Sequence, residues 1–160
     1  MISFDTPTHR FHLRAAAVIV HEGSVLLHRA NGDDFWALPG GRVAPGESLA
    51  HAVEREMLEE LGVKVNVGAL ALVIENFFSH GGKEHHEVGL YFYATPERRC
   101  HLLTERGPYL GREGSRPLTF AWFTPSELSS VQLRPIVLAE VLFKPNANVA
   151  HIVHHDAHAL

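Results

Sequence analysis

One stretch constrains the fold of this chain more than any other: residues 40–63, which read GGRVAPGESLAHAVEREMLEELGV. Residues 48–61 contain neither glycine nor proline and are rich in alanine, leucine, glutamate and arginine, which favours a helix. Gly62 is placed to end that helix in the left-handed conformation. An apolar stripe at helical spacing predicts the side that packs against a core; it consists of Leu49, Val53, Met57 and Leu61.

Three glutamates lie beside this stripe. Glu56, Glu59 and Glu60 fall within an arc of roughly 100° when the helix is drawn in projection. Carboxylates at this spacing repel one another and weaken a helix by a few tenths of a kcal/mol each. A divalent cation reverses that effect, and clustered oxygen donors suit Mg²⁺ or Mn²⁺. The alternative is a solvated acidic helix face, but such a face does not require the glycine-rich turn that precedes the helix.

Two turns precede the helix. Residues 38–41 (LPGG) end a short apolar run, and a glycine such as Gly41 lets the backbone approach a ligand closely. Pro45-Gly46 forms a second turn, which returns the chain to the helix N-terminus. The helix dipole favours a carboxylate at that end, and we expect Glu47 to accept hydrogen bonds from Arg55.

From Gly41 to Val63 the residues match the pattern G-x5-E-x7-R-E-U-x-E-E-x-G-U, where U is apolar, without a mismatch. This pattern resembles the Nudix box, the signature of hydrolases that cleave nucleoside diphosphates linked to another moiety. The resemblance implies an α/β fold, specifically an α/β/α sandwich with a mixed β-sheet and a loop followed by the box helix. It also implies homodimerisation as a common state of such proteins.

The resemblance further implies roles for individual residues. The implied metal ligands are the Gly41 carbonyl and the three box carboxylates, Glu56, Glu59 and Glu60. The implied catalytic residues are Glu56, Glu59 and Arg55, with Arg55 orienting Glu56 and Glu47 supporting Arg55 from behind. Nudix enzymes often add a glutamate from a loop before a late strand, and Glu113 occupies that region.

The expected activity is Mg²⁺- or Mn²⁺-dependent hydrolysis of a pyrophosphate bond, which makes the chain an enzyme of the Nudix pyrophosphohydrolase type. ADP-ribose or a nucleotide sugar is the first expected substrate class, and a (d)NTP is the second. The subfamily markers do not decide between them, because the ADP-ribose-type proline after the box is absent and phenylalanine stands where dinucleoside-polyphosphate hydrolases often have tyrosine. The alternative function is a nucleotide-binding sensor module without catalysis.

The rest of the chain predicts mostly strands. We expect strands at 11–20, 24–28, 35–38, 64–78, 87–95 and 118–123, a long loop at 96–117, a short helix from 124 and a last helix at 135–143. This order favours a mixed sheet with helices on both faces. We expect one domain over residues 1–160, with 1–10 and 145–160 as loose arms.

Composition excludes several classes of function. The net charge of −4 argues against binding to a nucleic-acid backbone. The apolar runs are too short to span a bilayer, no secretory leader is evident, and the single cysteine, Cys100, fits a reducing compartment. We therefore expect a cytoplasmic protein that acts on a nucleotide-type small molecule, without nucleic-acid or membrane partners.

Outside the box, the candidate substrate contacts are Arg29, Trp36, Arg42 and Phe78. For each aromatic residue the alternative is the core, and for each arginine it is solvent. The histidines of His85-His86-Glu87 lack the spacing of a helical zinc site and are expected to serve binding or packing in a strand. His151, His154, His155 and His158 would place a pair at i, i+4 in a helix, which suits a metal, but a frayed tail is the favoured interpretation.

Overall fold

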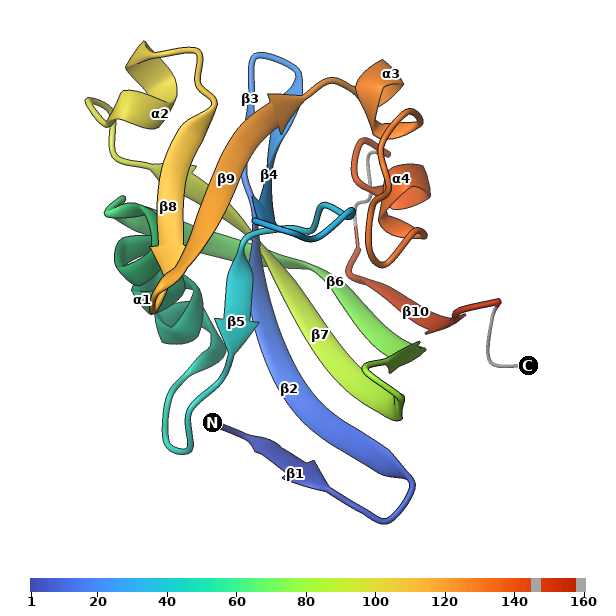
Figure 1. The fold of residues 1–160 in the computed structure, drawn as a ribbon. Helices are drawn as coiled ribbons and strands as arrows, with labels where there is room; N and C mark the ends of the chain where they lie inside the picture. The colour runs from blue at the N-terminus through green and yellow to red at the C-terminus, as the bar shows by residue number, and fades with distance from the viewer. Residues whose placement is uncertain (145–147, 158–160) are drawn as a thin grey trace.

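The computed structural model describes residues 1–144 and 148–157. The strands are β1 (Ser3–Asp5), β2 (His9–Val18), β3 (Val20–His21), β4 (Ser24–Ala30), β5 (Gly40–Arg42), β6 (Val65–His80), β7 (Lys83–Pro96), β8 (Tyr109–Glu113), β9 (Arg116–Phe123) and β10 (Ala150–His155). The helices are α1 (Leu49–Leu61), α2 (His101–Thr104), α3 (Pro125–Leu128) and α4 (Leu138–Val141). Figure 1 shows these elements in place.

The strands form two sheets. The larger sheet has the order β1-β2-β7-β6-β10, with β5 pairing to β2, and it is mixed because β2 runs parallel to β7 and β10 runs parallel to β6. The smaller sheet is antiparallel in the order β3-β4-β9-β8. The chain passes from one sheet to the other between Val18 and Val20, so the predicted strand at 11–20 is divided between them.

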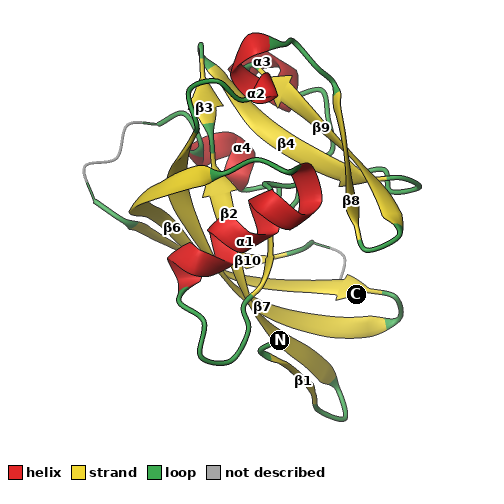
Figure 2. Ribbon diagram, turned by 90° about the vertical axis from the view of Figure 1, so that its left-hand side faces the viewer, coloured by secondary structure: helices red, strands yellow, loops and turns green. Residues whose placement is uncertain are grey.

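Helices cover both faces of the larger sheet. The apolar stripe of α1 enters a core with the inward side chains of β2 and β9, such as Ala17 and Phe120. On the other side, Leu128 and Leu138 from α3 and α4 enter a second core with Val18 and Ile74. Figure 2 shows α1 lying across the strands. The expected α/β fold with a mixed sheet between helices is confirmed.

Three expected elements differ in extent. The expected long loop at 96–117 contains α2 and β8, and β8 pairs with β9. The expected strand at 35–38 makes only isolated bridges, and the ordered strand lies at β5, on the glycines of the turn. The last helix covers four residues rather than nine.

The expected loose arms also differ from the structure. Residues 3–5 pair with β2 at the sheet edge, and 150–155 pair with β6 at the opposite edge. The sequence signal was weak because edge strands in contact with solvent do not need an apolar run. Residues 145–147 and 158–160 of the expected arm lie outside the described residues.

His151, His154 and His155 lie on strand β10 rather than in a frayed tail. His151 pairs with Glu75 (Nε2–Oε2 2.8 Å), and His155 stacks on Phe77 with 4.5 Å between ring centroids. A strand cannot place residues i and i+4 on one helical face, so the helical metal spacing does not arise here. His158 lies outside the described residues.

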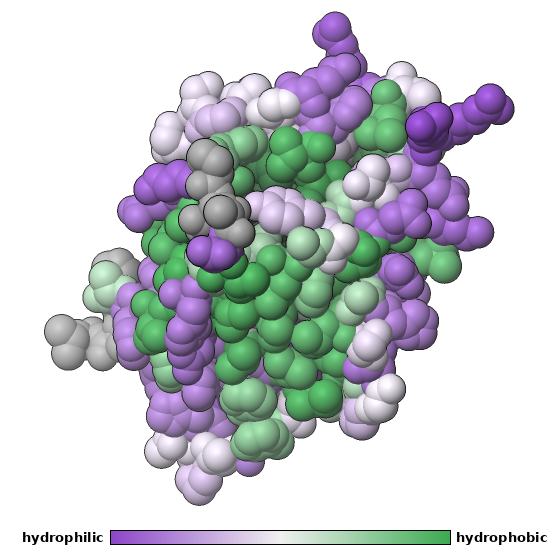
Figure 3. All heavy atoms as spheres, turned by 180° about the vertical axis from the view of Figure 1, so that it is seen from behind, coloured by the Kyte–Doolittle hydropathy of each residue, from purple (hydrophilic) through white to green (hydrophobic). Residues whose placement is uncertain are grey.

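Seen from behind, apolar side chains gather over the middle of the molecule (Figure 3). Large apolar residues that are exposed among the described residues include Val20, Tyr93 and Val153. An extended apolar surface of this kind is typical of interaction sites. The homodimer expected from the family resemblance stays a prediction.

Candidate active site

The box helix begins and ends where the sequence predicts. Ser48 caps the N-terminus, where its hydroxyl oxygen accepts a hydrogen bond from the His51 backbone N–H at 3.2 Å. Gly62 ends the helix with φ 70°, a left-handed conformation that favours glycine. These two caps fix the register of α1 and therefore the direction in which each glutamate points.

Arg55 connects the turn before the helix to two glutamates of the helix. Its Nε donates to Glu47 Oε1 at 2.7 Å, and its Nη1 donates to Glu56 Oε1 at 2.7 Å and to Glu59 Oε2 at 3.3 Å. Its Nη2 donates to the Arg42 carbonyl at 3.2 Å. The expected contacts of Arg55 with Glu47 and Glu56 are therefore present, and they hold the Glu56 carboxylate in one orientation.

Two of the three carboxylates that Arg55 contacts, Glu47 and Glu56, differ in their electrostatic environment. Hydrogen bonds from the Arg55 guanidinium lower the pKa of Glu47 to about 2. Burial raises the pKa of Glu56 above its ordinary value, and the Arg55 hydrogen bond opposes that effect. A carboxyl with a raised pKa binds a proton more readily, which suits Glu56 to proton transfer.

Gly41 is required where β5 meets α1. A Cβ atom at this position would overlap the Glu56 carboxyl group. The absence of a side chain thus lets the backbone of β5 lie directly against the carboxylate of the helix. The close approach seen here is to Glu56, and the predicted approach of the Gly41 backbone to a ligand stays a prediction.

A groove of about 440 Å³ runs past this junction. Its lining includes five of the residues predicted from sequence: Arg29, Gly41, Arg42, Glu60 and Glu113. These residues come from three strands (β4, β5 and β8) and the helix α1, so the fold has brought together positions far apart in the chain. Two of the predicted metal ligands, Glu56 and Glu59, do not line the groove: Glu56 is buried against Gly41, and the Glu59 side chain is 61% exposed.

The residues present fit a cation that is shared with substrate rather than enclosed by protein. Within residues 1–144 and 148–157, no group of three or more histidine, cysteine, aspartate or glutamate side chains is arranged to hold a metal ion. Mg²⁺ commonly uses only one or two carboxylates and completes its shell with waters and phosphate oxygens. Glu60 offers such a carboxylate, because it is only 5% exposed and its Oε2 has no hydrogen-bond partner.

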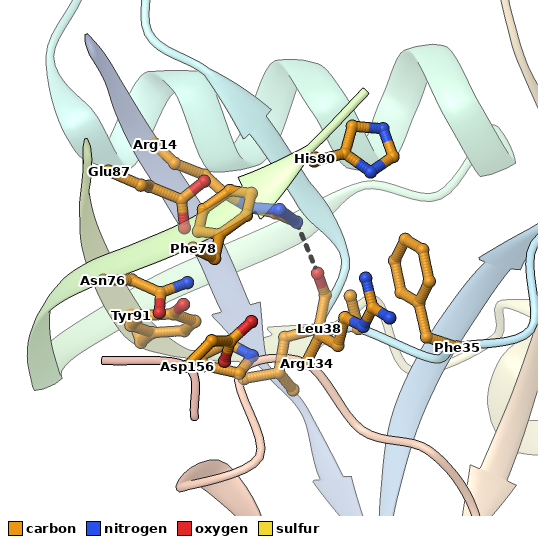
Figure 4. A pocket seen from close by; sticks show the side chains of 12 residues that line it. Arg14, Phe35, Leu38, Asn76, Phe78, His80, Glu87, Tyr91, Arg134 and Asp156 are labelled. Atoms are coloured by element: carbon orange, nitrogen blue, oxygen red, sulfur yellow. Dashed lines mark hydrogen bonds between the residues drawn. The ribbon is translucent and has the colours of Figure 1, made fainter. Parts of the chain in front are cut away.

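A second cavity of about 160 Å³ adjoins the groove (Figure 4). Its walls carry two aromatic rings, Phe35 and Phe78, and its polar lining includes Asn76 and Tyr91. Arg14 and Glu87 line both this cavity and the groove. The full lining is Arg14, Phe35, Ala37, Leu38, Asn76, Phe78, His80, Glu87, Tyr91, Arg134, Pro135 and Asp156.

Of the two aromatic residues predicted to contact substrate, Phe78 lines this cavity and Trp36 does not. Trp36 is 9% exposed, belongs to the second core and packs against Phe123 with 4.8 Å between ring centroids. Its neighbour Phe35 lines both cavities instead. The sequence places two aromatic residues side by side, and only the fold decides which of them faces the cavity.

The sequence did not predict three polar residues that line the smaller cavity: Arg14, Asn76 and Glu87. Each stands at the border of a largely apolar run in its strand, which is a usable signal because buried polar groups require a partner. Glu87 accepts from His12 Nε2 at 2.7 Å, and Arg14 Nη2 donates to the Leu38 carbonyl at 2.7 Å.

Unpaired buried polar atoms are concentrated around the two cavities. Six such side-chain atoms occur among the described residues: Arg14 Nε, His28 Nδ1, Glu60 Oε2, Asn76 Oδ1, His85 Nδ1 and His86 Nε2. All except the last belong to residues that line a cavity. Because unpaired buried polar atoms are rare in folded proteins, this concentration indicates a site built for a polar ligand.

The family profile of the NUDIX domain matches residues 10–143. The chain belongs to the Nudix family. It is 27% identical over 142 residues to a "MutT-like protein" of Streptomyces ambofaciens, covering 89% of this chain and 81% of that protein. It is 42% identical over 57 residues to the "CTP pyrophosphohydrolase" of Escherichia coli (strain K12), covering 33% of this chain and 42% of that protein.

Solved Nudix structures share the fold. A MutT NUDIX hydrolase from Burkholderia pseudomallei superposes with a TM-score of 0.64 at 24% identity, covering 84% of this chain and 98% of the other. The chain spans about half the length of the first curated relatives that it matches, between 38% and 60%. Among the described residues, no helix is both long and apolar enough to cross a membrane.

Proposed function

We propose that this Nudix protein hydrolyses a pyrophosphate bond in a nucleotide-type substrate, with a divalent cation as cofactor. The observation that carries the proposal is the groove whose lining combines Gly41, Glu60 and Glu113 with Arg29 and Arg42. Carboxylates for a cation and guanidinium groups for phosphate oxygens are both required to hold a charged diphosphate. Both types of group line one surface beside the Glu56 carboxylate.

Mg²⁺ or Mn²⁺ is the proposed cation. Glu60 and the Gly41 carbonyl would hold it, with Glu59 and Glu113 turning toward it from exposed positions. When bound, such a cation neutralises phosphate oxygens and lowers the pKa of a water molecule. The many waters and phosphate oxygens around Mg²⁺ explain why a complete set of protein ligands is not needed.

The chain's own residues supply positioning and proton transfer. Arg29 and Arg42 would contact phosphate oxygens, and Arg29 is held with its guanidinium 4.7 Å from the Trp36 ring centroid. Glu56 is the proposed proton acceptor, because burial raises its pKa while Arg55 fixes its direction. Glu47 acts only through Arg55.

The smaller cavity is the proposed site for the part of the substrate next to the diphosphate. Phe35 and Phe78 offer apolar faces to a flat ring, and the Asn76 amide oxygen lacks a partner. A cavity of about 160 Å³ admits one ring system rather than a whole nucleotide. We retain ADP-ribose or a nucleotide sugar as the first substrate class and a (d)NTP as the second.

A turnover screen tests the proposal. Wild type and Glu60→Gln would be incubated with Mg²⁺ or Mn²⁺ and with dNTPs, nucleotide sugars, ADP-ribose and dinucleoside polyphosphates, and the products would be resolved by chromatography. Glu54→Gln is the matched control, because Glu54 lies exposed on the same helix. We expect at least one substrate to be cleaved by wild type and by the control but not by Glu60→Gln.

The product pair would identify the bond that is broken. If no compound is cleaved and one of them still raises the melting temperature, hydrolysis is refuted and the domain is a nucleotide-binding module.

A further inference from the structure

His28 and Glu60 face each other across the wall of the groove. His28 Nδ1 lies 3.3 Å from Glu60 Oε2, and the two side chains are 13% and 5% exposed. Each of these two atoms is buried and has no hydrogen-bond partner in its present orientation. They are therefore complementary atoms, a ring nitrogen and a carboxylate oxygen, close enough to pair after a small rotation of either group.

The backbone fixes both residues in place. His28 lies in the middle of β4, where it pairs with Phe120 of β9 and bridges to Ala37. The Phe120 ring packs against the imidazole, with 5.4 Å between ring centroids. On the other side, a Cβ at Gly111 would overlap the Glu60 carbonyl, so β8 lies directly against the end of α1. The backbones of both residues are therefore held by their neighbouring strands, and only their side chains need to rotate for the pair to form.

In this geometry the two oxygens of the Glu60 carboxylate differ, because Oε2 is the one that lies near His28 Nδ1. A buried carboxylate oxygen without a partner is unfavourable, and a ring N–H is a suitable donor to it. We propose that His28 is a positioning residue for Glu60: its Nδ1–H donates to Oε2 and directs Oε1 into the groove, toward the cation. The inference rests on the proposed function, because Glu60 is the residue that would hold the cation.

Nothing in the sequence pattern of the box assigns a role to His28. It lies before the box, on another strand, and its ring reaches Glu60 only because β4 and α1 meet at the groove. Groups behind metal ligands commonly change metal affinity by 10–100-fold when they are removed. We expect an effect of that size.

Mn²⁺ binding provides a readout that is independent of catalysis. Free and bound Mn²⁺ would be measured by electron paramagnetic resonance for wild type, His28→Phe and His28→Asn. Phenylalanine keeps a ring against Phe120 and removes the donor, whereas asparagine offers an amide N–H near the position of Nδ1. We expect the Kd for Mn²⁺ to rise 10- to 100-fold in His28→Phe and to return to within about threefold of wild type in His28→Asn.

Two controls separate positioning from loss of structure. Circular dichroism and melting temperature without metal would show whether each variant folds, and His21→Phe, a substitution at a half-exposed histidine on β3, should leave the Kd unchanged. If His28→Phe does not fold, the comparison of His28→Asn with His28→Ala takes its place. Equal Kd values for wild type and a folded variant without the donor would overturn the inference.

Pulsed resonance on the Mn²⁺ complex distinguishes positioning from direct ligation. We expect no coupling to a directly bonded nitrogen in wild type; a nitrogen coupling that disappears in His28→Phe would replace the positioning role with a ligand role. If wild type hydrolyses substrate with Mn²⁺ and His28→Phe binds Mn²⁺ as tightly as wild type, only the role of His28 is refuted. Wild type that neither binds Mn²⁺ nor hydrolyses any substrate would refute the proposed function as well.

Discussion

Replacing Glu47 by glutamine should weaken the fold in a way that depends on pH. The pKa of Glu47 falls from 4.5 to about 2 because Arg55 donates two hydrogen bonds to its carboxylate and the Ala44 N–H donates another. The difference between those two values corresponds to about 3 kcal/mol of folding free energy at 1.36 kcal/mol for each pH unit. Both side chains are mostly buried, at 8% and 20% exposure, so solvent screening removes little of it.

The direction of the pH dependence follows from whether the folded or the unfolded state binds the proton of Glu47 more tightly. The folded state binds this proton more weakly than the unfolded chain, so the contribution is complete above the unfolded pKa of 4.5 and is lost as pH falls toward 2. Urea denaturation would measure the free energy of unfolding for wild type and Glu47→Gln at several pH values. We expect a difference of about 3 kcal/mol at pH 7 that shrinks steadily below about pH 4.5.

Glu54→Gln, on the exposed side of the same helix, should leave the free energy of unfolding unchanged over the same pH range. A Glu47→Gln effect that stays constant from pH 7 to pH 3 would refute the ionic clamp. It would mean that packing, and not the charged hydrogen bonds of Arg55, holds the turn to the helix.

Three further outcomes follow from the site. Gly41→Ala should lower kcat by about 100-fold by displacing the Glu56 carboxylate, whereas Gly68→Ala, which meets only an ordinary contact at 3.4 Å, should not change kcat. In a rate–pH profile, kcat/KM should fall on the acidic side with a pKa above 4.5 that belongs to Glu56. Arg55→Leu removes a hydrogen-bond donor to Glu56 and should move this fall to higher pH. Phe35→Ala and Asn76→Leu should raise KM about tenfold with kcat nearly unchanged in steady-state assays.

Local features of the site could be predicted from the sequence. The helix, its two caps and the contacts of Arg55 with Glu47 and Glu56 arise within one turn and one helix. Spacing at 3.6 residues per turn and the conformational freedom of glycine therefore determine them. The box also led correctly to the fold, because its pattern is long and specific.

Features that depend on strand pairing could not be predicted in the same way. His12 and Glu87 are 75 residues apart in the chain and meet only because β2 pairs with β7 in parallel. The choice of Phe35 over Trp36 as the cavity residue depends on a one-residue phase, which strand alternation alone leaves open. His28 had no signal at all, because its partner is on a helix that begins 21 residues later.

Hydrolysis in ¹⁸O-labelled water tests the central claim most directly. Wild type and Glu60→Gln would react with the best substrate of the turnover screen, with and without Mg²⁺, and mass spectrometry would locate the label in the two phosphate products. We predict a single ¹⁸O in one of the two products, formed by wild type only when the cation is present. Products without label, or equal product formation by Glu60→Gln, would contradict attack by water at a phosphorus held by a Glu60-bound cation.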